Sequence, residues 1–90
     1  MIGHIYHHYV ERIEPGSNMA RFYSLGVRPT LFGDYSLMRC WGRIGTRGQC
    51  KEHIFKEEAD AMNQLLDFLN AKIRRGYRAP IRMMHVRHTG

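Results

Sequence analysis

The middle of the chain alternates apolar and polar residues with the two-residue period of β-strands. The alternation is clearest over residues 20–28, and Pro29 ends it because proline has no N–H to donate to a sheet. One face of this strand carries Tyr23, Leu25 and Val27. Three further strands are predicted at 9–14, 35–44 and 49–55. Turn-forming residues separate the strands at 15–18, 32–34 and 45–48.

The last two strands are expected to form an antiparallel hairpin about a turn bounded by glycines. Pairing them about residues 46–47 places Cys40 opposite His53 and Cys50 opposite Arg43. The two sulfurs are then offset along the ladder, so we expect no disulfide between them. In this register one face carries Leu37, Arg39, Trp41, Arg43, Cys50 and Ile54.

Residues 57–75 are predicted to form an amphipathic helix, because apolar positions recur at spacings of three and four. Acidic residues fill its first turn and basic residues its last turn, as the helix dipole favours. Gly76 supplies a left-handed stop, whereas Lys56 is a poor N-cap. The predicted apolar stripe consists of Ala59, Met62, Leu65, Leu66, Leu69 and Ile73.

The chain has 90 residues, of which 43% are hydrophobic, so it is long enough for one core and too short for two. No run of 18 apolar residues is present, and the first residues begin neither a charged nor an apolar signal segment. We therefore expect no membrane span and no secretory signal. Two cysteines without a C-x-x-C pair are typical of free thiols in a cytoplasmic protein.

Positive charge is concentrated in two parts of the chain. Fourteen basic residues against eight acidic ones give a net charge of +6, and eleven of the fourteen are arginines, whose planar guanidinium suits phosphate. Residues 19–51 carry six bases and one acid, residues 72–90 carry six bases and no acid, and residues 57–69 carry four acids and no base. A segregated basic surface is typical of a protein that binds a polyanion, although such charge also aids solubility.

Catalytic motifs are absent from the sequence, which lacks G-x-S-x-G, H-E-x-x-H, a Walker loop and G-x-G-x-x-G. Cys50 and His53 are candidates for a thiolate pair, but residues three apart on a strand face opposite sides. We therefore expect no enzymatic activity and no cofactor. We also expect no metal at the two histidine groups, which lack carboxylate or cysteine partners at ligand spacing: His4, His7 and His8, and His85 and His88.

One constellation remains, at residues 41–49. It places the indole of Trp41 and the guanidiniums of Arg43 and Arg47 around a turn whose glycines allow a ligand to approach the backbone. An indole face can stack on a sugar or a base while a guanidinium binds phosphate. The alternative is that Trp41 is a core residue, as a single tryptophan in a small domain more often is.

Residues 41–45 and 48–49, Trp-Gly-Arg-Ile-Gly and Gly-Gln, resemble the signature of the WGR domain, which is named for the first three of them. Residues 18–23 resemble the family's upstream Asn-x-x-Lys-Phe-Tyr, with Arg21 in place of the lysine. Residues 72–77 resemble the Lys…Gly-Tyr pattern that closes the helix of the family. The sequence is therefore identified as a member of this family.

The resemblance covers residues 9–78, and we expect residues 1–8 to be a loose lead-in and residues 79–90 a basic tail. It implies an α+β fold, in which one long C-terminal helix packs across a single antiparallel β-sheet of about four strands. WGR domains occur beside the catalytic region of DNA-dependent poly(ADP-ribose) polymerases, where they bind DNA ends and relay that binding. They also occur in bacteria as short stand-alone proteins, which this chain resembles because it has no room for a polymerase domain.

The resemblance also implies roles for individual residues. Trp41 would stack against the sugar of a terminal nucleotide, and Arg43 would contact phosphate or, in the polymerases, the catalytic domain. Asn18 and Arg21 would lie near the same edge, and Gln49 would form a hydrogen bond across the hairpin. The remaining motif residues would have structural roles that permit close approach: Gly42, Gly45 and Gly48. A core position is expected for Phe22, Tyr23 and Tyr77.

We therefore expect a non-enzymatic module that binds nucleic acid, with DNA favoured over RNA, in the cytoplasm and, in a bacterium, at the nucleoid. It would contact the DNA backbone, ends or nicks, with little base readout and no membrane contact. The alternative is a protein-interaction or regulatory module, or a homo-oligomer, that uses the same edge of Trp41 and Arg43. The expected nucleic-acid contacts are Trp41, Arg43, Arg21, Asn18, Arg39, Arg47 and Lys51.

Overall fold

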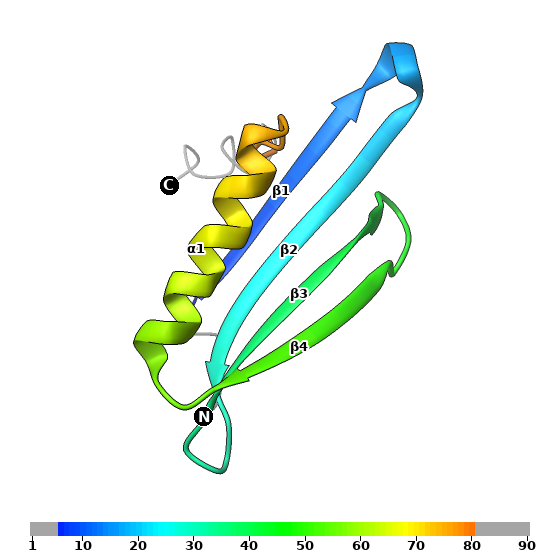
Figure 1. The fold of residues 1–90 in the computed structure, drawn as a ribbon. Helices are drawn as coiled ribbons and strands as arrows, with labels where there is room; N and C mark the ends of the chain where they lie inside the picture. The colour runs from blue at the N-terminus through cyan, green and yellow to red at the C-terminus, as the bar shows by residue number, and fades with distance from the viewer. Residues whose placement is uncertain (1–5, 81–90) are drawn as a thin grey trace, which may run out of the picture.

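Residues 6–80, which the computed structural model describes, form one antiparallel sheet followed by one helix (Figure 1). The sheet contains, side by side in chain order, β1 (Tyr6–Glu14), β2 (Met19–Pro29), β3 (Tyr35–Arg43) and β4 (Gln49–Phe55). A short 3-10 turn, Pro15–Ser17, joins the first two strands. The helix α1 (Glu58–Arg74) crosses one face of the sheet. This α+β arrangement confirms the fold class expected from the sequence.

The core lies between α1 and the sheet, and it is built on the alternation in β2. Tyr23, Leu25 and Val27 face α1, so the predicted inner face of this strand is confirmed. The cross-strand pairs extend this face into β3, where Trp41 lies opposite Tyr23 and Leu37 opposite Val27. Five core side chains have no exposed surface: Leu25, Val27, Leu37, Ala61 and Leu65.

The first strand begins three residues before its predicted start. β1 starts at Tyr6 rather than at Tyr9, and His7 Nε2 lies 3.2 Å from the hydroxyl of Ser24 on β2. The first three residues of β1 are therefore part of the sheet and not of a loose lead-in. Residues 6–8 show no alternation of apolar and polar side chains, so the hydrophobic pattern does not predict a strand there. They form a strand because they pair with β2. The rest of the lead-in (1–5) and most of the tail (81–90) lie outside the described residues.

The helix packs only half of the predicted stripe against the sheet: Leu65 and Leu69 are buried, and Met62 packs against the core. Ala61, Leu65 and Leu69 are buried, and Phe68 packs beside them. Apolar residues cover a wide arc of α1, and a sheet can cover only part of that arc. The ring of Phe68 contacts Arg39, which directs α1 toward β3. Three residues of the predicted stripe are consequently exposed: Ala59, Leu66 and Ile73.

Strands β3 and β4 pair three positions away from the predicted register. Cys40 lies opposite Cys50, and Trp41 lies opposite Gln49. Because an odd shift moves every side chain of a strand to the other face, Cys50 and Ile54 lie away from α1 instead of beside Trp41. The prediction of two free thiols was wrong, since the two cysteines form a disulfide with their Cα atoms 4.1 Å apart.

The turn of the hairpin explains this shift. The backbone N–H and the hydroxyl of Thr46 both donate to the carbonyl of Arg43, at 3.1 and 2.8 Å. The tight turn is therefore centred before residues 46–47, and a loop of residues 44–48 separates the two strands. Hydrophobic pattern carries no information on this loop length, because hydrogen bonds and glycine conformations determine it.

After α1 the chain returns to the free edge of β1. Gly76 has a φ of +100° and ends the helix, as predicted. The backbones of Glu11 and Arg78 then exchange two hydrogen bonds of 2.8 Å each. This return buries Tyr77, whose ring meets that of Tyr23 edge-on at 6.4 Å. Tyr77 thereby joins the sheet to the end of the helix.

Candidate nucleic-acid interface

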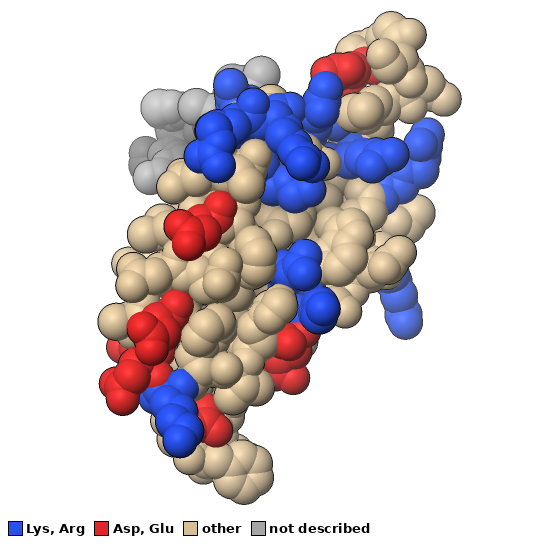
Figure 2. Space-filling view, in the orientation of Figure 1, with Lys and Arg blue, Asp and Glu red and all other residues tan. Residues whose placement is uncertain are grey.

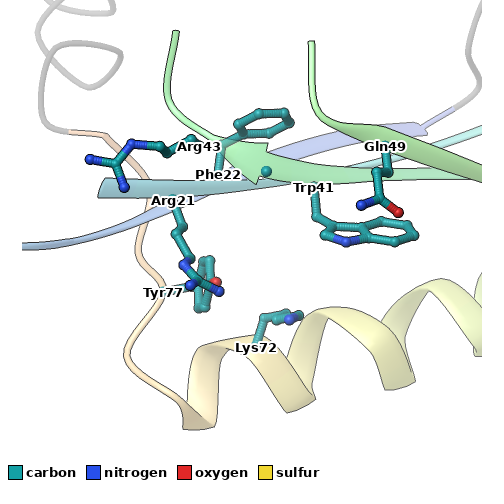
Figure 3. A pocket seen from close by; sticks show the side chains of 8 residues that line it. Arg21, Phe22, Trp41, Arg43, Gln49, Lys72 and Tyr77 are labelled. Carbon is teal, nitrogen blue, oxygen red and sulfur yellow. The ribbon is translucent and has the colours of Figure 1, made fainter. Parts of the chain in front are cut away.

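A pocket of about 340 Å³ lies where the sheet approaches the last turn of α1 (Figure 3). We call it the Trp41 pocket. Its volume is near the lower end of the range for small-ligand sites, about 300–1,000 Å³. No acidic residue is among the described residues that line it: Arg21, Phe22, Trp41, Gly42, Arg43, Gln49, Lys72 and Tyr77. Five of these eight are residues that the sequence predicted for the site or its motif.

Trp41 lies at the boundary between the core and the pocket. Across the sheet it is paired with Tyr23 on β2 and Gln49 on β4, and it packs against the core while remaining partly exposed. Figure 3 shows its indole extending from the sheet toward α1, on the side where Lys72 lies. Trp41 is therefore not sealed in the core, and part of the indole is accessible from the pocket.

Arg39 packs against the indole and is not among the residues that line the pocket. Its guanidinium carbon is 5.0 Å from the ring centroid of Trp41 and 4.8 Å from that of Phe68. Its Nε donates a hydrogen bond of 3.0 Å to Nε2 of His53. Burial, and then the charges of Arg39 and Lys51, lower the pKa of His53, which favours the neutral ring that can accept this bond.

Two arginines of the pocket are direct cross-strand neighbours. Arg21 on β2 lies opposite Arg43 on β3, and both side chains are exposed. Figure 3 shows Arg21 extending toward Tyr77, whereas Arg43 extends away from the indole. Like charges at opposed positions of a sheet repel each other, and an anion bound between them would reduce that repulsion.

Lys72 supplies the third cation of the pocket. Its Nζ lies 4.8 Å from the ring centroid of Tyr23 and 5.2 Å from that of Tyr77. Burial lowers the pKa of Lys72, and nearby positive charges lower it further, chiefly that of Arg75. The site therefore disfavours additional positive charge and favours an anionic ligand.

Three pocket residues were not predicted for the site from the sequence: Phe22, Lys72 and Tyr77. From the sequence, Lys72 is a basic residue of the last helical turn, and Phe22 and Tyr77 are core residues. The resemblance adds only that Lys72 and Tyr77 belong to the pattern that closes the helix of the family. A signal was present, because Lys72 follows Leu65 by seven positions and Leu69 by three, and so shares their face of the helix. A lysine on the buried face of a helix is a candidate for a site at the edge of the core.

Gly42 and Gly48 bring two backbone segments of the hairpin into contact. A Cβ on Gly48 would overlap the carbonyl oxygen of Trp41 and lie 2.9 Å from the ring of Phe22. A Cβ on Gly42 would lie 2.7 Å from the Cα of Gly48. Gly48 also has a φ of +70°, which other residues rarely adopt. The two glycines thus determine the path of the backbone that carries Trp41.

The family model of the WGR domain matches residues 6–82, a range that includes the whole sheet, the helix and the Trp41 pocket. This chain belongs to the WGR domain family. A similar protein from Sinorhizobium fredii (strain NBRC 101917 / NGR234), "Uncharacterized protein y4dW", is 53% identical over 78 residues. The match covers 87% of this chain and 38% of that relative, so the chain spans well under half of the relative's length. No solved structure matches the chain.

WGR domains are associated with nucleic-acid binding. Besides Arg39, three of the residues expected to contact nucleic acid lie outside the Trp41 pocket of this WGR domain. Asn18 is exposed at the turn between β1 and β2, in a left-handed conformation with a φ of +54°. Arg47 is exposed in the hairpin loop, and Lys51 is exposed on β4 opposite Arg39. The structure therefore brings together Arg21, Trp41 and Arg43 in the pocket, and Arg39 packs on the indole outside the pocket lining. The other three expected contacts, Asn18, Arg47 and Lys51, do not line the pocket.

Charge is separated along the length of the WGR domain. Figure 2 shows basic side chains gathered over the end where α1 finishes, and acidic side chains toward the end where α1 begins. The last turn of α1 contributes Lys72 and Arg74 to the basic end, and its first turn contributes Glu58 and Asp60 to the acidic end. The Trp41 pocket lies in the basic half, because Lys72 lines it.

Among residues 6–80 of the WGR domain, no three histidine, cysteine or acidic side chains are grouped in a way that could hold a metal ion. The histidines at 4, 85 and 88 lie outside the described residues. In the same described part of the chain, α1 is neither long nor apolar enough to cross a membrane.

Proposed function

We propose that this WGR domain is a non-enzymatic module that binds the sugar–phosphate backbone of DNA, at an end or a nick, in the Trp41 pocket. The observation that carries the proposal is that three cations share one pocket with a partly exposed indole. Arg21, Arg43 and Lys72 line the pocket with Trp41, and no acidic residue does so among the described residues. A phosphate neutralises such a cluster, and an indole face covers an adjacent sugar.

The shape of the site supports contact with a backbone end more than with the bases of a duplex. The pocket is small, and its cations suit phosphate rather than the edges of paired bases. A terminal or nicked nucleotide exposes the face of its deoxyribose, on which Trp41 would stack. The exposed side chains of Arg47 and Lys51 would extend the contact along the strand, and Asn18 would contact it at the adjoining turn.

Arg39 has a different role in this proposal, because its guanidinium already packs between two aromatic rings. It would act through the indole of Trp41 rather than as a phosphate contact. In a bacterium, binding to DNA would place the protein in the cytoplasm at the nucleoid.

Removing one pocket cation should change the salt dependence of binding in a defined way. We expect Arg43→Ala to weaken binding to a short duplex with a nick or a blunt end, and to flatten the log–log dependence of affinity on salt by about 0.9. Trp41→Ala should weaken binding but leave this slope nearly unchanged, because it removes stacking and no charge. Fluorescence anisotropy of a labelled duplex over a series of NaCl concentrations measures both quantities.

Arg28→Ala is the matched control, because Arg28 is an exposed arginine near the opposite end of β2 and does not line the Trp41 pocket. It removes the same charge and should leave affinity and slope close to the wild-type values. Wild-type binding by both Arg43→Ala and Trp41→Ala would refute the proposed site. Circular dichroism confirms that each variant is folded.

A further inference from the structure

Two large apolar side chains project into solvent from the loop between β2 and β3. Leu31 is 83% exposed and Phe32 is 90% exposed, the highest values among the large apolar residues that the structure describes. We call these two residues the Leu31–Phe32 tip. Exposed apolar side chains at the end of a loop are costly in water unless another molecule covers them.

Hydrogen bonds fix the backbone conformation of the loop that carries this tip. The hydroxyl of Thr30 accepts hydrogen bonds from the backbone N–H groups of Phe32 and Asp34, at 3.1 and 3.2 Å. The N–H of Thr30 donates to the carbonyl of Asp34 at 2.8 Å, and Gly33 takes a φ of +88°. The loop therefore presents its two apolar side chains from a defined backbone conformation, which lowers the entropy lost when they bind.

The surroundings of the tip are acidic. It lies at the end of the molecule where α1 begins, and Figures 1 and 2 together place acidic side chains there. Glu52 and Arg28 line the shallow pocket next to Leu31. Negative charge at this end disfavours a nucleic acid or an anionic membrane as the partner of the tip. The acidic residues near this end are Asp34, Glu52, Glu57, Glu58 and Asp60, against the basic residues Arg28 and Lys56.

A surface complementary to this tip exists on the same protein. The Trp41 pocket offers the partly exposed ring of Trp41 to an apolar side chain, and its three cations suit an acidic rim. The Leu31–Phe32 tip of one copy cannot reach the Trp41 pocket of the same copy. Arg21 and Pro29 stand eight residues apart on β2, which is about 26 Å of strand, and the tip lies beyond Pro29.

We propose that the Leu31–Phe32 tip of one copy inserts into the Trp41 pocket of a second copy, so that the chain associates head to tail. The ring of Phe32 would pack against Trp41, and the acidic end of one copy would face Arg21, Arg43 and Lys72 of the next. The proposal does not rest on nucleic-acid binding, but it uses the same pocket. Self-association and binding of DNA in the Trp41 pocket therefore exclude each other.

Head-to-tail contact has three consequences that a symmetric dimer lacks. Each assembly keeps one free tip and one free pocket, so growth continues as concentration rises. A contact made by one loop tip and one pocket would be small, below about 1,200 Å², so we expect association only at protein concentrations on the order of 100 μM or more. Since it joins opposite charges, it should weaken when NaCl is raised from about 0.05 to about 0.5 M.

Complementation between two variants tests the proposal. Phe32→Ser removes the tip, and Arg43→Glu reverses a charge in the pocket; both residues are exposed, so both variants should fold. In sedimentation velocity at low salt, each variant alone should remain monomeric, whereas an equimolar mixture should form a dimer and grow no further. The wild type should form dimers and larger species as its concentration rises. A monomeric wild type at millimolar concentration, self-association of Phe32→Ser equal to wild type, or a mixture that stays monomeric would each overturn the proposal.

A nucleic-acid arm separates this inference from the proposed function. Phe32→Ser should bind a nicked duplex with the affinity and salt slope of the wild type, and the duplex should dissociate wild-type assemblies. Complementation without any duplex binding would support the head-to-tail contact and refute the proposed function. Duplex binding without complementation would support the proposed function and refute the head-to-tail contact.

Discussion

At the scale of single residues, the position of one side chain determines what the pocket can bind. The backbone of Trp41 is constrained by Gly48, which packs against its carbonyl oxygen. The indole is constrained by Arg39, whose guanidinium lies 5.0 Å from the ring centroid. Neither residue needs to touch a ligand to affect binding, because both act through the orientation of the indole.

Gly48→Ala tests the constraint on the backbone. The new Cβ would overlap the carbonyl oxygen of Trp41 at a φ of +70°, so we expect a loss of about 2–4 kcal/mol in the free energy of unfolding. Gly45→Ala is the matched control: Gly45 also has a positive φ, of +94°, but no atom lies near its Cβ position. It should cost about 1 kcal/mol. Urea unfolding of the two variants measures the difference, and equal losses would contradict the close contact.

Arg39→Met tests the constraint on the indole. Methionine keeps the apolar stem but removes the cation over the ring and the hydrogen bond to His53, so the indole should become more mobile. Trp41 is the only tryptophan, so its fluorescence reports this site alone. We expect stronger quenching by acrylamide, a loss of about 1 kcal/mol in stability and weaker duplex binding. Arg39→Lys keeps the charge but loses the Nε donor, so its acrylamide quenching should lie between that of the wild type and that of Arg39→Met. Quenching of Arg39→Met equal to that of the wild type would refute a positioning role for Arg39.

At the scale of secondary-structure elements, the alternation of apolar and polar residues predicted the strands but not the register in which they pair. The alternation in β2 correctly predicted which side chains face the core, and β4 has its predicted bounds. The register of the hairpin depends on hydrogen bonds of Thr46 and on the tight packing of Gly48, which no periodicity records. That register decides that Cys40 meets Cys50, so the disulfide could not be predicted from the pattern.

The disulfide should stabilise the hairpin that carries the pocket. The disulfide joins two cysteines ten positions apart and so encloses residues 41–49. In the chain-entropy model a loop of this length contributes about 2–3 kcal/mol to the free energy of unfolding. We expect Cys40→Ser with Cys50→Ser to unfold at a lower urea concentration than the oxidised wild type, by an amount that corresponds to this free energy. The wild type with a thiol reductant should behave like the double variant. Identical unfolding curves for the oxidised and the reduced protein would contradict this expectation.

At the scale of the whole molecule, charge and apolar exposure divide the protein into two ends. The basic end holds the Trp41 pocket, and the acidic end holds the Leu31–Phe32 tip. The sequence revealed the separation of charge, since acids and bases occupy different stretches. It could not reveal the pocket in full, because Trp41 and Lys72 are 31 positions apart and meet only through the rotation of α1 on the sheet. That rotation is set by side-chain packing, which the apolar spacing of α1 does not determine.

A nucleotide backbone that enters the Trp41 pocket would change the surroundings of the indole, so the fluorescence of Trp41 reports its binding. Wild-type protein at about 1 μM, well below the concentration expected for self-association, is titrated with a short nicked duplex at several salt concentrations. We expect a saturable change in indole emission whose midpoint moves to higher duplex concentration as salt rises. Indole emission that stays constant while the anisotropy of a labelled duplex shows saturated binding would contradict entry of the backbone into this pocket.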